Sequence, residues 1–242
     1  TYDSEKLNAE MENEANGLVR AWLALLRARD LPFNEASVAT IIDWVDSDDV
    51  VVSEWGAEQQ SYEANRELVM VANSALTDVE ELAVMRGYGP SSVSLLKPWI
   101  SALPRATSIN INTASEQILL AMGGEFPQTF TDYVLRQRPF YSLDNFHEGL
   151  SVALDIEQKQ IATLWANDFV GITTDYFQLQ LEVTLGESQL RINSVLSRSN
   201  RNEPVVISRT VRMVPAIIGR LSDDQDNVAV LPTGFCEHLE SS

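Results

Sequence analysis

The chain has 242 residues, of which 45% are hydrophobic and 21% charged, so it is long and apolar enough to bury a core in one or two domains. Its 35 acidic side chains outnumber the 17 basic ones and give a formal net charge of −18. A surface this acidic disfavours general binding to nucleic acid, because that affinity depends on cationic side chains that neutralise phosphates. The charge favours a protein that attracts cations.

Two helices are predicted before residue 46. Residues 18–29 are apolar on most sides, which is typical of a buried helix, and residues 36–45 place apolar side chains at helical spacing. Residues 46–66 lack a clean period and carry five acidic side chains by Glu58, so we expect a long ordered loop there. Loops of this length inside a domain are uncommon unless they are functional or held in place.

Two capping boxes mark the next helix starts. Thr77 precedes Glu80, and Thr113 precedes Glu116, in the S/T-x-x-E spacing whose side chains bond the free amides of a helix start. Each box is followed by apolar residues at helical spacing. We therefore predict that Thr77 and Thr113 cap two short helices.

Each of these helices is followed by a glycine-containing turn and a second helix. Residues 87–90 read Gly-Tyr-Gly-Pro and precede a helix at 92–100, whereas Gly123 and Gly124 precede a helix near 129–136. Glycine supplies turn angles that other residues resist. The pattern predicts a twofold helix-hairpin-helix repeat, of the SAM-like kind.

The pattern changes to period two after Asn167, once a last helix at 156–165 has ended. Alternating apolar residues predict three antiparallel strands, at residues 176–185, 190–196 and 205–214. A three-stranded sheet with one apolar face needs a cover, most simply a helix. The predicted fold class is α+β, with helices and strands segregated along the chain.

Acidic residues cluster at the end of the second predicted helix. Asp43, Asp46, Asp48 and Asp49 fall within seven residues and Glu58 follows, and this loop holds no Lys or Arg before Arg66. Clustered carboxylates repel one another unless a cation neutralises them. Calcium accepts six to eight oxygen ligands in flexible loops, so it is the expected ion.

The acidic segment is not an EF-hand. Counted from Asp46, Val50 replaces the fifth ligand, Val51 the sixth-position glycine and Ala57 the twelfth-position glutamate. The alternative to a calcium site is a solvated helix end in which Asp43 makes local hydrogen bonds. The residues alone leave both interpretations open.

The hairpin pattern also allows a nucleic-acid-binding module. In such modules backbone amides of the hairpin meet a phosphate and basic side chains lie nearby, but residues 77–150 contain five basic residues against eight acidic ones. Catalytic signals are weak, because no G-x-S-x-G, H-E-x-x-H or P-loop string occurs. We expect neither catalytic residues nor an organic cofactor.

Four motifs follow one another along the chain. The first is Ile-Ile-Asp-Trp-Val-Asp-Ser-Asp at 41–48, with Gly-Ala-Glu at 56–58 and Tyr62. The second is Leu-Thr-Asp-Val-Glu-Glu-Leu at 76–82, with Arg86 and Gly87; the third is Asn-Ile-Asn-Thr-Ala at 110–114; the fourth is Tyr176, Phe177 and the strands to Arg198. In this order they resemble the minor pseudopilin K family of type II secretion systems.

The resemblance implies a pseudopilin-type antiparallel sheet with a large helical domain inserted. It implies a non-enzymatic protein at the tip of the periplasmic pseudopilus, assembled with minor pseudopilins I and J above pseudopilin H, in the export of folded proteins across the outer membrane. Family members bind Ca²⁺ in the helical domain, so the resemblance makes Asp43, Asp46, Asp48 and Glu58 the candidate ligands.

The amino terminus departs from the family pattern, which begins with a hydrophobic helix. This chain begins at Thr1, and none of its apolar runs approaches the length of a transmembrane helix. We therefore expect a periplasmic fragment of an inner-membrane-anchored protein, whose only membrane contact is the missing helix. The single cysteine, Cys236, is expected to be a free thiol, and the alternative is a disulfide partner that lies outside this chain.

The sequence divides into four expected regions. Residues 1–30 would be a remnant of the pseudopilin amino-terminal region with its first helix, and residues 31–166 the helical domain with the acidic loop and both hairpins. Residues 167–215 would form the β-meander, and residues 216–242 a polar tail.

Overall fold

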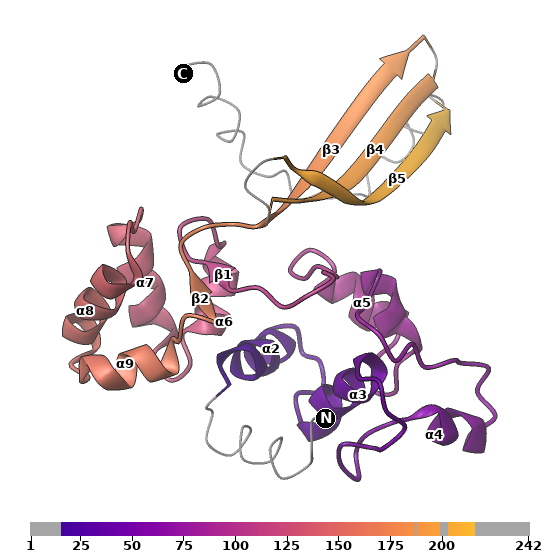
Figure 1. Cartoon of the computed structure of the whole chain (residues 1–242), viewed down its shortest axis with the longest axis horizontal. Helices are drawn as coiled ribbons and strands as arrows, with labels where there is room; N and C mark the ends of the chain where they lie inside the picture. The colour runs from indigo at the N-terminus through magenta and orange to yellow at the C-terminus, as the bar shows by residue number, and fades with distance from the viewer. Residues whose placement is uncertain (1–15, 187, 199–202, 216–242) are drawn as a thin grey trace. The chain divides into compact units, whose positions relative to one another are not determined.

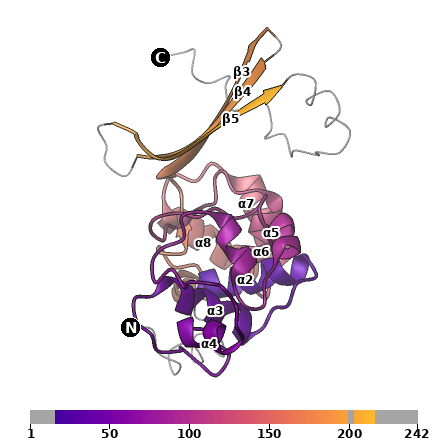
Figure 2. The same ribbon diagram turned by 90° about the vertical axis from the view of Figure 1, so that its right-hand side faces the viewer.

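The computed structural model describes residues 16–186, 188–198 and 203–215 (Figures 1 and 2). The chain divides into two compact units between Thr173 and Thr174. Three predicted features lie outside the described residues: residues 1–15 of the amino-terminal region, the polar tail at 216–242, and Cys236 within that tail. Within the described part of the chain, no helix combines the length and hydropathy needed to cross a membrane.

The first unit contains the helices and one short pair of strands. In chain order these are α2 (Gly17–Ala28), α3 (Glu35–Val45), α4 (Gln59–Ala64), the 3-10 helix η1 (Val79–Val84), α5 (Pro90–Leu96), β1 (Ile109–Asn110), α6 (Glu116–Met122), α7 (Pro127–Gln137), α8 (Leu143–Leu154), α9 (Gln158–Leu164) and β2 (Val170–Gly171). The second unit contains β3 (Tyr176–Leu185), β4 (Ser188–Ser197) and β5 (Val205–Pro215). The α+β fold class is therefore confirmed.

The first two helices lie where the sequence predicts them, and both begin at asparagine caps. The Asn16 side chain accepts hydrogen bonds from the first-turn amides of Leu18 and Val19. Asn34 and Ser37 form a reciprocal capping box at the start of α3. Such caps stabilise a helix because they satisfy amides that have no partner within it.

Both predicted capping residues are wrong by one or two positions. Asp78, not Thr77, caps the first hairpin: its carboxylate accepts from the Glu80 amide, and Glu81 accepts from the amides of Thr77 and Asp78. In the second hairpin Ser115 accepts from the Ile118 amide. Serine and aspartate are both strong caps, so nearby candidates compete, and backbone geometry decides between them.

Two helical hairpins are present, formed by η1 with α5 and by α6 with α7 (Figure 1). The first begins with a 3-10 helix and the second with an α-helix, so the two differ in their local geometry. The turn before α5 contains Gly87 at φ +85°, a left-handed conformation that glycine adopts without strain. Whether the hairpins are a true repeat remains a prediction.

Four elements were not predicted from the sequence. α4 lies inside the segment 46–66 expected to be a loop, α8 was not predicted, and β1 pairs in parallel with β2. The β1–β2 pair joins Ile109 to Val170 across about sixty residues, so no local pattern could reveal it. It also explains why the unit boundary falls after Thr173 and not at residue 166.

The hydrophobic core of the first unit consists of large buried clusters. One cluster is aromatic, and in it Phe130 stacks on Trp165 at 5.2 Å between ring centroids. A second cluster joins α2 to the residues around the acidic loop, including Leu26, Trp44 and Tyr62. α2 therefore belongs to the helical unit, although the sequence placed it in a separate amino-terminal region.

The second unit is a twisted three-stranded antiparallel sheet in the order β3–β4–β5, as predicted (Figure 1). In register, Leu181 lies beside Ile192 and Ile192 beside Val211, so apolar side chains share one face. Leu181 and Val211 are exposed by 46% and 55%. This apolar face is therefore open to solvent in the structure described.

Candidate metal centre

The acidic residues lie on the connection between α3 and α4. α3 ends at Val45, Asp46 is its carboxyl-terminal cap, and Glu58 is the residue before α4. The chain therefore leaves one helix and enters the next with a carboxylate at each junction. This arrangement folds the loop back so that its two ends meet.

Asp43 holds this loop in place and is fully buried. Its Oδ1 accepts a hydrogen bond of 2.9 Å from the Val52 amide, and its Oδ2 accepts one of 2.6 Å from the Ala57 amide. A Cβ at Gly56 would lie 2.0 Å from the same Oδ2, so only glycine leaves room for the contact. Asp43 thus uses both oxygens to fasten the loop.

Three other carboxylates converge on one another. Asp46, Asp48 and Glu58 each offer an oxygen, and these oxygens all lie within 4.8 Å of one another. Asp43 lies outside this group, although the sequence predicted it as a ligand. The structure therefore brings together three of the four predicted residues and gives Asp43 a hydrogen-bonding role behind them.

Two members of the group have no protein partner for their charge. Both carboxylate oxygens of Asp46 and both of Glu58 are buried and accept no hydrogen bond. The Glu58 side chain is only 2% exposed, and it makes no capping bond at the start of α4. A buried ionised carboxylate without a partner is strongly unfavourable, so these oxygens would be stabilised by a bound cation or by a proton.

The pKa values of this group reflect the cost of burying ionised carboxylates without partners. Burial, followed by repulsion from the carboxylates of Asp43 and Asp46, raises the pKa of Glu58 from 4.5 to about 7. Burial and the neighbouring charge of Asp48 also raise the pKa of Asp46. Without a cation, Glu58 is therefore partly protonated near neutral pH.

The donor set fits a hard divalent cation. All three converging side chains are carboxylates, which Ca²⁺ and Mg²⁺ prefer over softer ions. Ca²⁺ fits better, because an irregular loop that encloses the ion and supplies several carboxylates is typical of its sites, whereas Mg²⁺ keeps most of its waters. In such a site Asp46, Asp48 and Glu58 would supply the charged ligands.

A hydrogen bond to η1 holds the end of α3, from which the acidic loop begins. Trp44 follows Asp43 in α3, and its Nε1 donates a hydrogen bond to Glu81 Oε2 at 3.2 Å. The same glutamate bonds the backbone of Thr77 and Asp78 at the start of η1. Sequence analysis missed this link because it joins residues 37 positions apart.

The hairpins show little sign of a phosphate site. Of the five basic residues between 77 and 150, three are engaged within the protein: Lys97 pairs with Glu80, Arg86 donates to the Ser61 carbonyl, and Arg138 donates to the Ala114 carbonyl. Phosphate recognition needs cationic side chains directed at the ligand. These three cationic side chains are therefore already engaged within the protein.

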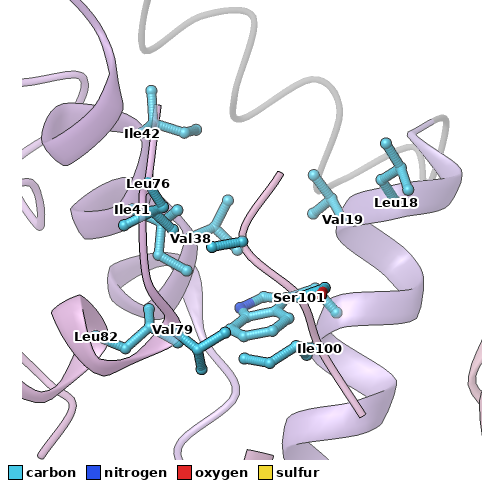
Figure 3. Close-up of a pocket in the computed structure, with 12 residues that line it drawn as sticks. Leu18, Val19, Val38, Ile41, Ile42, Leu76, Val79, Leu82, Ile100 and Ser101 are labelled. Carbon is cyan, nitrogen blue, oxygen red and sulfur yellow. The ribbon is translucent and has the colours of Figure 1, made fainter. Parts of the chain in front are cut away.

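An apolar groove of about 340 Å³ lies between α2 and α3 (Figure 3). In Figure 3, Val19 of α2 lies on one side of the groove and Val38 and Ile41 of α3 lie on the other, and Ile100 also lines the space. This groove offers apolar contacts and no ionic ligands, so it does not compete with the acidic group as a metal site.

The chain is similar to known secretion proteins. Residues 5–105, which include the acidic loop and the first hairpin, match the family model of type II secretion system protein K. The chain is 32% identical to protein K of Pseudomonas aeruginosa over 149 residues, which are 61% of this chain and 42% of the relative. It is 36% identical to that of Aeromonas hydrophila over 98 residues, 39% of this chain and 30% of the relative. The alignments thus span less than half of either relative.

A solved structure gives the same answer for the fold. It is the complex of GspK, GspI and GspJ from the type II secretion system of enterotoxigenic Escherichia coli, and the match has a TM-score of 0.64 at 26% identity. It covers 80% of this chain and 69% of the matched one. The family model, the relatives and the solved structure therefore agree that this chain is similar to type II secretion system protein K.

Proposed function

We propose that this chain is a non-enzymatic structural component of a type II secretion pseudopilus. It assembles with minor pseudopilins I and J at the tip of the pseudopilus in the periplasm, above pseudopilin H, and so supports export of folded proteins across the outer membrane. The observation that carries the proposal is the likeness to a chain of the GspK–GspI–GspJ complex over 80% of this chain.

The acidic loop gives this component a Ca²⁺ site. Asp46, Asp48 and Glu58 bind the ion, and Asp43 fixes the loop that presents them. The ion neutralises buried carboxylates that otherwise have no partner, so its main effect is on the stability of the helical unit. The support for Ca²⁺ is the combination of convergence, burial and unpaired oxygens.

Reconstitution tests the assembly proposal. The chain is mixed with purified minor pseudopilins I and J from the same organism, and the mass of the product is measured by size-exclusion chromatography with light scattering. We expect one complex containing all three proteins. A mixture in which this chain elutes alone, while I and J form their own complex, would contradict the proposal.

The same preparation tests the nucleic-acid alternative. Labelled duplex DNA is titrated with the chain at low salt, where non-specific phosphate binding is strongest. We expect no binding at micromolar protein, because the net charge of −18 repels phosphates. Salt-sensitive micromolar binding would favour the hairpins as a nucleic-acid module.

A further inference from the structure

The connection between α4 and η1 contains an extended segment with alternating burial. Val69 and Val71 pack against the core cluster that contains Tyr62 and Trp44. Leu68 and Met70 point away from it and are exposed by 106% and 80%. Alternation with a period of two is the side-chain pattern of a β-strand, although no strand pairs here.

One backbone edge of this segment is already occupied. The Gln59 side chain donates to the Val69 carbonyl at 3.2 Å and accepts from the Val71 amide at 3.0 Å. Glu63 accepts a further bond from the Gln59 amide group and holds it in place. The Gln59 amide therefore takes the position that a neighbouring strand would take.

The opposite backbone edge is free. Successive residues of an extended chain direct their amides and carbonyls to opposite edges, so Leu68, Met70 and Ala72 face away from Gln59. Within the described ranges, the backbone groups of these three residues form no hydrogen bond with the protein. An exposed, apolar strand edge of this kind readily pairs with another chain.

We propose that residues 68–72 form a docking edge, which accepts an extended strand of a partner protein by β-addition. The partner strand pairs with the Met70 amide and carbonyl, and its apolar side chains cover Leu68 and Met70. Because Glu67 is exposed next to Leu68 and the chain carries a net charge of −18, the partner strand carries basic side chains between the apolar ones.

Charge argues against a second copy of this chain as the occupant. Two copies would bring their exposed Glu67 side chains together, and each copy carries a net charge of −18. Like charges across an interface are unfavourable, and a strongly charged protein tends to remain monomeric. The docking edge depends on neither the metal site nor assembly with I and J.

Short peptides test the docking edge in the intact chain. The probe is a blocked peptide of about six residues that alternates valine and lysine, and binding is followed by fluorescence anisotropy. Hydrogen exchange of the Met70 amide is measured with and without the probe. We expect the probe to bind and to slow exchange at Met70 by at least about tenfold.

Two control peptides separate strand pairing from charge attraction. The first has the same sequence with alternate amides methylated, so it keeps its charge and apolar surface but loses donors along one edge. The second replaces lysine with glutamate. We expect each to bind at least about tenfold more weakly than the probe. Equal binding of the methylated peptide would mean that the charge alone attracts the probe, and equal binding of the glutamate peptide would remove the case for a basic partner.

Two variants at one position complete the test. Met70→Pro removes the free amide and keeps an extended backbone, whereas Met70→Ala removes only the side chain. The Met70 amide has no partner in the protein, so both variants should melt near the parent temperature. We expect Met70→Pro to weaken probe binding at least about tenfold, and more than Met70→Ala does. Unchanged binding by Met70→Pro, or unchanged exchange at Met70 with saturating probe, would overturn the proposal.

Discussion

Asp43 and Glu58 are both buried carboxylates, yet they differ in their hydrogen-bond partners. Asp43 receives two backbone amides, whereas both oxygens of Glu58 lack a protein partner. Backbone amides can stabilise a buried carboxylate through charge-assisted hydrogen bonds. An orphan carboxylate needs a proton or a cation instead. The structure therefore assigns Asp43 to the loop and Glu58 to the ion.

Replacing Glu58 tests the metal site directly. Glu58→Gln removes a buried charge, so without calcium it should raise the melting temperature, at about 2–4 °C per kcal/mol for a chain of this size. The same variant should respond less to added calcium, because one ligand charge is lost. Differential scanning fluorimetry in EDTA and in calcium measures both effects.

Glu54 provides the matched control for this experiment. It is an exposed glutamate on the same loop and lies outside the converging group. Glu54→Gln should therefore leave both the EDTA melting temperature and the calcium response within experimental error of the parent. A parent protein that melts at one temperature in EDTA and in calcium would falsify the metal proposal.

The raised pKa of Glu58 predicts a pH dependence with a defined sign. Between pH 4.5 and about 7 the folded metal-free protein holds a proton that the unfolded chain has lost, so stability falls as pH rises through this window. The loss from Glu58 is on the order of 3 kcal/mol. Calcium favours the ionised form, so the gain in melting temperature on adding calcium should grow from pH 5 to pH 8. A gain independent of pH in both the parent and Glu58→Gln would contradict the assignment.

A change at Asp43 should have a different signature. Asp43→Asn leaves one acceptor oxygen for two amides, at Val52 and Ala57, so one buried donor loses its bond. Such a loss costs about 1–3 kcal/mol. We expect destabilisation of similar size in EDTA and in calcium, measured by urea denaturation. An effect confined to the calcium-bound protein would show that Asp43 is a ligand.

At the scale of elements, local sequence patterns predicted where helices and strands lie more accurately than they predicted the residues at which these elements begin and end. The asparagine-capped helices and the β-meander carry strong periodic signals, and both are where the sequence predicts them. The caps of the two hairpins were wrong because several capping residues stand side by side. α4 was missed because it is only six residues long, too short to show a clear period.

The corrected cap of α6 gives a test at this scale. Ser115→Ala should destabilise the protein by about 1 kcal/mol, because the Ile118 amide loses its acceptor. Thr113→Ala, at the position that the sequence favoured, should change stability by less than about 0.5 kcal/mol. Urea denaturation of the two variants compares them directly, and the reverse order would restore Thr113 as the cap.

At the scale of the whole molecule, the two units differ in how they are stabilised. The large buried clusters consist of residues from the first unit alone, whereas the sheet keeps an apolar face exposed. A three-stranded sheet gains independent stability only when its hydrophobic face is packed. The helical unit should therefore fold without the sheet.

Truncation after Thr173 tests this independence. The fragment of residues 1–173 should retain helical circular dichroism, melt cooperatively and keep the calcium-dependent shift, because its core and the acidic group are complete. The full chain provides the control. A fragment that fails to melt cooperatively would show that the sheet is required to stabilise the helices.

The sequence by itself determined the α+β class, the order of the motifs and the presence of an acidic loop, because each is written in residues close together along the chain. Only the tertiary structure decided which carboxylates converge, that Asp43 clamps the loop, and that β1 pairs with β2. It also revealed that Gln59 covers one edge of residues 68–72 and leaves the other free. These features depend on contacts between distant residues or on backbone direction, and neither leaves a periodic trace in the sequence.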